Sequence, residues 1–111
     1  MAVRMTKSWR PLTALEVDGL AGHLGVFQLA NDNGDIVQIG CADARTRFGL
    51  REMLRAALAE PPHGATCFRI ESTMAYRTRY TELLQAYWHD HATLPPGNDD
   101  NPDHLGRLRP A

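Results

Sequence analysis

The stretch LGVFQLANDNGDIVQIG, residues 24–40, decides the fold that the sequence predicts. Its centre is the polar run Asn-Asp-Asn-Gly at 31–34, whose residue types tolerate the positive φ angles of a tight hairpin turn. Residues that favour strands lie on both sides of this run: Val26, Leu29, Ile36, Val37 and Ile39. The pattern therefore predicts a β-hairpin with strands near 25–30 and 35–40.

Two longer apolar patterns after the hairpin predict helices. One helical face is formed by residues at the spacing i, i+3, i+4, i+7 and i+8: Leu50, Met53, Leu54, Ala57 and Leu58. This face predicts a helix near 44–60, capped by Asp43 and ended by two prolines. A wide apolar stripe predicts a second helix near 73–91, capped by Ser72 or Thr73.

Shorter signals complete the predicted fold. Thr13 and Glu16 have the spacing of a capping box, which predicts a short helix before the hairpin. Residues 65–71 alternate in polarity and predict a third strand. The expected fold class is α+β, with a small three-stranded antiparallel sheet flanked by helices.

The chain is expected to form one domain with two less ordered ends. Residues 1–11 are expected to be a loose N-terminal arm, with Trp9 as a candidate anchor, and residues 12–98 the α/β domain. Four prolines and several Asp and Asn residues follow position 93. They predict an irregular, partly disordered tail over 99–111.

The composition fits a small cytoplasmic domain. With 43% hydrophobic residues among 111, the chain can build a core. No apolar run approaches the roughly 18 residues of a membrane span, and none follows the basic N-terminus as in a secretory signal. Cys41 and Cys67 are too few for a disulfide framework, so both are expected to be reduced thiols. No membrane partner is expected.

The charge pattern allows a local anion site. The formal net charge is −1, which weighs against a protein that neutralises the phosphates of duplex DNA. Arg accounts for eleven of the twelve basic residues, and Arg suits bidentate contacts with oxyanions. The candidate residues are Arg45, Arg47, Arg51, Arg77 and Arg79. The alternative is that these are ordinary surface arginines beside acidic residues such as Glu52 and Glu82.

The hairpin and the elements after it resemble the GIY-YIG superfamily. Gly25-Val26-Phe27 is followed after ten residues by Gln38-Ile39-Gly40, and then by an Arg-bearing helix, a strand and a helix with a central Glu. The resemblance covers residues 24–98. It implies an α+β domain related to nucleases that hydrolyse phosphodiesters with a divalent metal, Mg²⁺ or Mn²⁺.

The resemblance also implies roles for individual residues. Phe27 and Gln38 occupy the positions of the two motif tyrosines, and the catalytic Arg would be Arg47 or Arg51. Glu82 would bind the metal. The remaining candidates for ligand binding are Gly25, Gly40, Arg77 and Asn98.

Both tyrosine positions depart from the family pattern. A Phe ring has no group that can position or deprotonate water, and the Gln38 amide cannot supply a phenolate. Loss of a general acid or base typically costs about 10² to 10⁴ in rate. One hypothesis is therefore a domain without standard nuclease activity that binds an anionic ligand, a nucleic acid or a protein partner. The alternative is a divalent-metal-dependent DNA endonuclease with altered catalytic residues, and a third reading is a plain structural partner domain.

A geometric expectation follows from these assignments. Arg47 and Arg51 are expected one turn apart on one helix edge, converging with Glu82 on a concave surface beside Gly40. Tyr76 or Tyr80 could project a hydroxyl into the same pocket and partly replace a motif tyrosine. Cys41 directly follows the second motif, either as a packing residue at a strand end or as a nucleophile with a lowered pKa.

Overall fold

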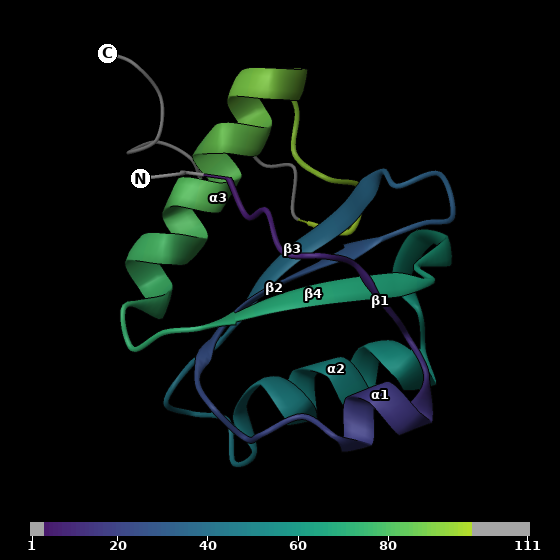
Figure 1. The fold of residues 1–111 in the computed structure, drawn as a ribbon. Helices are drawn as coiled ribbons and strands as arrows, with labels where there is room; N and C mark the ends of the chain where they lie inside the picture. The colour runs from purple at the N-terminus through teal and green to yellow at the C-terminus, as the bar shows by residue number, and fades with distance from the viewer. Residues whose placement is uncertain (1–3, 99–111) are drawn as a thin grey trace.

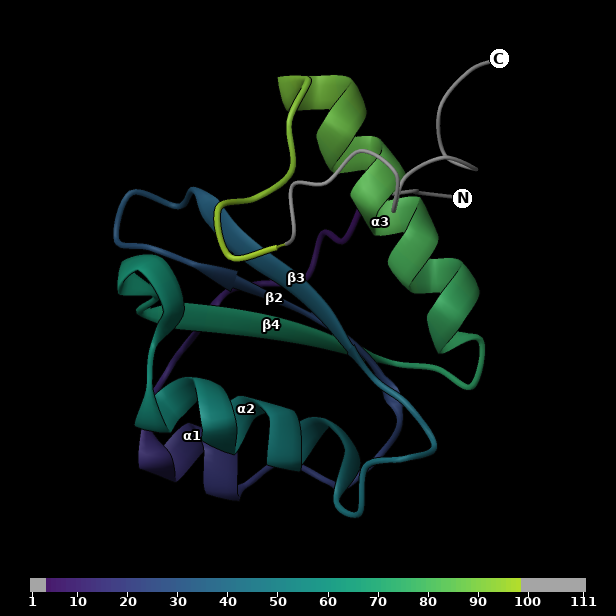
Figure 2. The same ribbon diagram turned by 180° about the vertical axis from the view of Figure 1, so that it is seen from behind.

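A four-stranded antiparallel sheet with helices on both faces forms the domain, in a computed structural model that describes residues 4–98 (Figures 1 and 2). The strand order is β1-β4-β2-β3. The strands are β1 (Arg10–Pro11), β2 (Gly25–Ala30), β3 (Ile36–Ala42) and β4 (Cys67–Ser72). The helices are α1 (Ala14–Asp18), α2 (Gly49–Ala59) and α3 (Tyr76–His91), with a 3-10 turn over Pro62–Gly64. The predicted α+β class is confirmed.

The sheet has one strand more than the three that the sequence predicts. Arg10 and Pro11 pair with Phe68 and Cys67 at the edge of β4. Two residues are too few to show an alternating pattern, and Pro is tolerated on an edge strand because it lacks an N–H. The sequence therefore carries no recognisable signal for β1.

The sequence predicted a loose arm over 1–11, but residues 4–11 pack against the domain. Met5 is buried, and the Trp9 ring lies 4.1 Å from the guanidinium carbon of Arg69. Figure 1 shows this segment crossing the α3 face of the sheet before it enters β1. Trp9 is thus the anchor that the sequence suggested. The predicted tail over 99–111 lies outside the described residues.

The sheet separates two hydrophobic cores. The core under α1 and α2 contains Val17, Leu20, Phe27, Leu29, Val37, Leu50, Leu54 and Phe68. The core under α3 contains Met5, Val26, Ile39, Leu83, Leu84 and Leu94. Because side chains alternate along β2, Phe27 lies in the core under α1 and α2, and Val26 lies in the core under α3. Helices α2 and α3 therefore lie on opposite faces of the sheet (Figure 1).

A β-bulge sets which β3 side chains face α2. Leu29 pairs with Gln38 and Ala30 pairs with Ile36, so Val37 is the extra residue of the bulge. Beyond the bulge, alternation places Gln38 and Gly40 on the same face as Phe27. The two positions of the motif tyrosines thus share the α2 face.

Both long helices begin later than the predicted ranges, which were set by the proposed caps. Asp43 does not cap α2, because its carboxylate accepts hydrogen bonds from the Arg45 main chain and guanidinium. A loop over 43–48 follows, and Gly49 opens the helix with a φ of 57°. At α3, the Thr73 hydroxyl accepts a hydrogen bond from the Ala75 N–H, so the helix starts at Tyr76. The predicted Thr13 cap is present, and Thr13 accepts from the Glu16 N–H at 3.3 Å.

Candidate functional site

A cavity of about 520 Å³ opens beside the edge strand β3, and we call it the β3-edge cleft. It is lined by Phe27, Gln38, Ile39, Gly40, Cys41, Asp43, Arg45, Thr46, Met53, Tyr80, Gly97 and Asn98. Four residues to which the resemblance gives a place in the site therefore meet here: Phe27, Gln38, Gly40 and Asn98. Three further candidates from the sequence, Cys41, Arg45 and Tyr80, line the same cleft. Helix α2 reaches the cleft through Met53, and α3 reaches it through Tyr80.

Phe27 and Gly40 form a tight packing pair across the hairpin. The two residues are direct partners in the β2–β3 ladder. A Cβ atom at position 40 would overlap the Phe27 ring, so the ring needs a glycine opposite it. Gly25 has a similar constraint, because a Cβ there would overlap the Glu71 carbonyl oxygen. Gly25 lies outside the cleft, and its close approach to β4 explains why a glycine stands there.

Asn98 closes part of the β3 edge. Its Nδ2 donates to the Ile39 carbonyl and its Oδ1 accepts from the Ile39 N–H, both at 2.8 Å. The Gly97 N–H donates to the Val37 carbonyl at 2.6 Å. The chain after α3 returns along β3 in Figure 2. Asn98 therefore fixes the segment after α3 against β3, where a further strand would otherwise pair, and so forms one wall of the cleft.

Tyr80 brings a phenol into the cleft. Asn98 Nδ2 lies 3.4 Å from the Tyr80 hydroxyl, which accepts this hydrogen bond. Burial raises the pKa of Tyr80, so the phenol stays protonated at neutral pH and serves as a hydrogen-bond donor. Among residues 4–98 neither this hydroxyl proton nor the Gln38 side-chain amide has an acceptor. Tyr76 takes a different role, because its hydroxyl accepts from the Ala44 N–H.

Arg45 supplies the cationic group of the cleft. Its guanidinium pairs with Asp43 at 2.8 Å and its side chain is 91% exposed. These hydrogen bonds from Arg45 hold the pKa of Asp43 below its usual value, and the charge of nearby Arg77 acts in the same direction. The sequence did not single out Arg45 over its neighbours, because residues 44–48 fall within the predicted helix over 44–60 and not in a loop.

Cys41 lacks the environment of a nucleophile. Burial, followed by the charge of Asp43, raises the pKa of its thiol. The nearby charges of Arg45 and Arg77 act in the opposite direction but do not outweigh these effects. The thiolate is the reactive form, so this position favours an unreactive thiol.

The two arginines that the resemblance favours for catalysis lie away from the cleft. Arg47 is exposed in the loop before α2, where its main-chain N–H donates to Glu52 at 3.2 Å. Arg51 lies on α2 with its guanidinium carbon 5.8 Å from the centre of the Phe48 ring. Its Nε is buried and has no hydrogen-bond partner among the described residues. The expectation that both lie one turn apart on a helix is wrong, because the helix begins only at Gly49.

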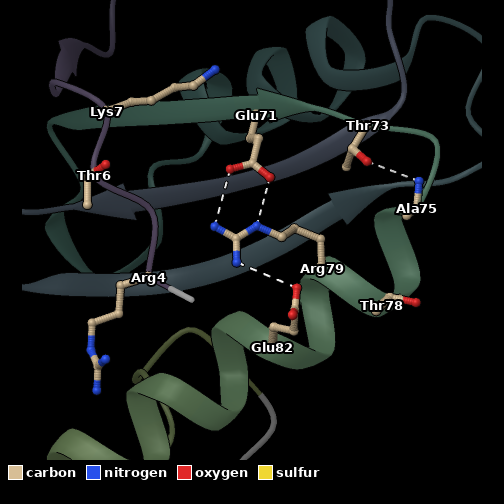
Figure 3. A pocket seen from close by; sticks show the side chains of 9 residues that line it. All are labelled: Arg4, Thr6, Lys7, Glu71, Thr73, Ala75, Thr78, Arg79 and Glu82. Atoms are coloured by element: carbon tan, nitrogen blue, oxygen red, sulfur yellow. Dashed lines mark hydrogen bonds and ion pairs between the residues drawn. The ribbon is translucent and has the colours of Figure 1, made fainter. Parts of the chain in front are cut away.

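Glu82 lies in a different cavity, of about 430 Å³, between the N-terminal segment, the end of β4 and the start of α3 (Figure 3). Arg79, whose side chain is 13% exposed, donates to Glu71 from Nε at 2.7 Å and from Nη2 at 3.2 Å. Its Nη1 lies 3.7 Å from Glu82. Figure 3 shows the guanidinium of Arg79 between the two carboxylates.

This arrangement does not fit the metal that the resemblance implies. The carboxylates of Glu71 and Glu82 already share the guanidinium of Arg79, so a metal ion would have to displace an internal cation. Residues 4–98 contain no group of three His, Cys, Asp or Glu side chains placed to hold a metal ion. The expected convergence of Arg47, Arg51 and Glu82 beside Gly40 is wrong, because α2 and α3 cover opposite faces of the sheet.

The fold and the cleft define a small α+β domain with a candidate ligand site at an edge strand. The chain belongs to the family described as Domain of unknown function (DUF7508), whose model matches residues 3–90. No curated protein and no solved structure gives a significant match to the chain. In the part of the chain that the structure describes, no helix combines the length and apolar character needed to cross a bilayer.

Proposed function

We propose that the domain is a GIY-YIG-like module that binds an anionic ligand at the β3-edge cleft and does not cleave phosphodiester bonds. The observation that carries this proposal is that Phe27, Gln38, Gly40 and Asn98 meet in one cleft while Glu82 lies elsewhere, bound to Arg79. The cleft thus keeps the positions of the motif, while Glu82 lies outside it and Asp43, the carboxylate that lines it, is paired with Arg45.

The donors of the cleft support anion binding. The hydroxyl of Tyr80 and the amide of Gln38 are hydrogen-bond donors that no described residue satisfies. Arg45 donates to Asp43 from Nε and Nη2, and no described residue accepts from its Nη1. The exposed guanidinium of Arg45 can therefore keep its pairing with Asp43 and donate to a bound oxyanion from its remaining N–H groups.

The residues at the tyrosine positions argue against hydrolysis. Phe27 has no titratable group, and Gln38 can donate and accept hydrogen bonds but cannot take up a proton from water. The protonated phenol of Tyr80 can bind a phosphate oxygen, whereas a general base would need a lower pKa. These three side chains are suited to holding an oxyanion rather than to activating water.

One observation favours a second candidate function, a metal-dependent DNA endonuclease. Tyr80 places a phenol in the cleft where Phe27 and Gln38 lack one. For this function Glu82 would have to leave Arg79 and reach the cleft with a divalent metal. Cleavage that requires both Tyr80 and Glu82 would support the endonuclease over the binding module.

A titration of the full chain with inorganic phosphate, and then with a single-stranded tetranucleotide, tests the binding proposal. We expect saturable shifts in the NMR signals of the Gln38 side-chain amide. Arg45→Gln should weaken binding by about tenfold, as expected for loss of a charge-assisted hydrogen bond. Added salt should also weaken it, because exposed charges are screened over about 8 Å at physiological ionic strength.

Arg55→Gln is the matched control, because Arg55 is also an arginine paired with one carboxylate, that of Asp18 at 3.1 Å, and lies outside the cleft. This variant should bind both probes like the wild type. Equal losses in Arg45→Gln and Arg55→Gln would indicate only a general charge effect and would contradict a site at the cleft. Absence of saturable binding by the wild type would also contradict it.

A further inference from the structure

A third cavity contains a half-buried cation that has no carboxylate partner. The cavity has a volume of about 240 Å³ and lies between the N-terminal segment, the sheet and α3. Arg69 reaches it from β4, and Gln28 reaches it from β2. These two residues are direct partners in the ladder between the strands. The cavity does not include the lining residues of the β3-edge cleft.

Arg69 is held only by neutral groups. Its Nε donates to the Gln28 Oε1 at 2.7 Å, its Nη1 donates to the Lys7 carbonyl at 3.1 Å, and its guanidinium lies against the Trp9 ring. No carboxylate among residues 4–98 forms an ion pair with it, in contrast to Arg4, Arg10, Arg45, Arg55 and Arg79. Burial lowers the pKa of Arg69, which reflects the cost of removing this charge from water.

Two donors beside the cavity lack acceptors. The Nη2 of Arg69 and the side-chain nitrogen of Gln28 make no hydrogen bond within the described part of the chain. Gln28 is the one buried polar or charged residue among those described, with 3% of its surface exposed. Neither of these two nitrogens is among the buried unpartnered atoms of the described residues, so both are open to the cavity and can donate to a molecule bound there.

The remaining walls determine what kind of acceptor fits. They are mainly apolar and come from Met5, Ile36, Leu83, Ala86 and Tyr87. Asp90 also lines the cavity, but its carboxylate is held by Arg4 at 2.6 and 2.8 Å and does not neutralise Arg69. Arg4, Thr6 and His91 line the cavity as well, and Arg4 is already paired with Asp90. One guanidinium without a carboxylate, beside this apolar surface, suits one negative charge attached to an apolar body. The volume lies below the about 300 to 1,000 Å³ of pockets for drug-sized ligands.

We propose that this cavity binds a small monocarboxylic acid with an apolar body, whose carboxylate accepts hydrogen bonds from Arg69 and Gln28. The carboxylate supplies the charge that Arg69 lacks, and the acyl or aryl part lies between Leu83, Ala86 and Tyr87. The proposal does not depend on the β3-edge cleft or on the function proposed for it.

Benzoate is a suitable probe, with benzamide as its uncharged counterpart. Titration of the full chain should give saturable binding of benzoate, followed by NMR through the Arg69 Nε–H and the Gln28 side-chain amide. Benzamide and inorganic phosphate should each bind about tenfold more weakly or not at all, because one lacks the charge and the other lacks the apolar body.

Two variants test the site, one by removing its charge and the other by filling its volume. Arg69→Met removes the charge and should weaken benzoate binding by about tenfold or more. Ala86→Trp fills the cavity, leaves Arg69 in place and should abolish binding. Arg55→Gln on the other face of the sheet should bind benzoate like the wild type.

Three results would overturn the proposal. They are absence of saturable benzoate binding by the wild type, benzamide or phosphate binding as tight as that of benzoate, and undiminished binding by folded Ala86→Trp. If Arg69→Met fails to fold, the Ala86→Trp variant and the comparison of benzoate with benzamide still decide the question.

Discussion

Phe27 and Gly40 show how a motif-like pattern can be maintained by packing. The Phe27 ring is buried in the α2 core and occupies the space that a Cβ at position 40 would need. An aromatic residue opposite a glycine covers the strand where the glycine has no side chain. The two residues therefore have a structural reason to occur together, whether or not the cleft binds a ligand.

Gly40→Ala should destabilise the domain by about 1 to 3 kcal/mol, as overpacking of a well-filled core does. Gly19→Ala is the matched control, because a Cβ there meets its nearest atoms at 3.6 Å and the φ of −80° suits any residue. Urea denaturation measures both changes. Equal stability of the two variants would show that the Phe27 ring can move away without cost.

Tyr80 should make the stability sensitive to alkaline pH. Burial raises its folded-state pKa above the ordinary value of 10.0. A raised folded-state pKa contributes stability that is fully present below the unfolded-state pKa and is lost as the pH rises through the folded-state pKa. Burial also raises the pKa of Tyr87, so both residues contribute to this loss.

Tyr80→Phe should therefore lose less stability than the wild type between about pH 9 and pH 11, the range in which tyrosines ionise. Urea denaturation at several pH values measures the two slopes, and Tyr87→Phe provides a comparison outside the cleft. Parallel slopes for the wild type and Tyr80→Phe would mean that the Tyr80 phenol ionises as freely in the folded protein as in the unfolded chain.

At the scale of elements, the segment after α3 protects the edge of β3. Open edge strands are prone to pair with other chains, and proteins commonly cover them. Here the Gly97 N–H donates to the outward carbonyl of Val37, and the Asn98 side chain bonds to the outward N–H and C=O of Ile39. Leu94 and Pro95 of the same segment are buried. The side chain of Asn98 thus replaces the backbone of a neighbouring strand.

Asn98→Ala should cost about 1 to 3 kcal/mol, because it leaves the N–H and C=O of Ile39 without partners at a partly buried edge. Hydrogen exchange at the Ile39 amide should increase with the loss of stability. Asn33→Ala in the exposed hairpin turn is the control and should have little effect. Unchanged exchange at Ile39 in Asn98→Ala would refute a protective role of this segment.

Local patterns in the sequence predict most of the elements but not the site. The hairpin, the apolar face of α2 and the long α3 follow from alternation and helical spacing, and these signals involve near neighbours in the chain. The late start of α2 depends instead on Gly49, where a Cβ would overlap the His23 carbonyl oxygen. Such a contact between distant residues has no periodic signal, and it moves Arg47 from a helix into a loop.

At the scale of the molecule, the connections between elements decide where the candidate residues lie. Phe27, Gln38 and Gly40 face α2, whereas α3 crosses to the opposite face of the sheet (Figure 1). Tyr80 reaches around the β3 edge to the cleft, while Glu82 faces Arg79 near the end of β4. Periodicity shows that a helix has an apolar face but not which face of the sheet it covers.

The separation of Glu82 from the β3-edge cleft is therefore the feature that argues most strongly against metal-dependent hydrolysis. The most direct measurement is cleavage of plasmid and single-stranded DNA by the purified chain with Mg²⁺ or Mn²⁺, in parallel with Glu82→Ala. We expect no cleavage above the buffer background for either protein, because Glu82 lies outside the cleft, Asp43 in the cleft is paired with Arg45, and Phe27 and Gln38 cannot activate water. Metal-dependent cleavage by the wild type that disappears in Glu82→Ala would contradict this account and establish the endonuclease.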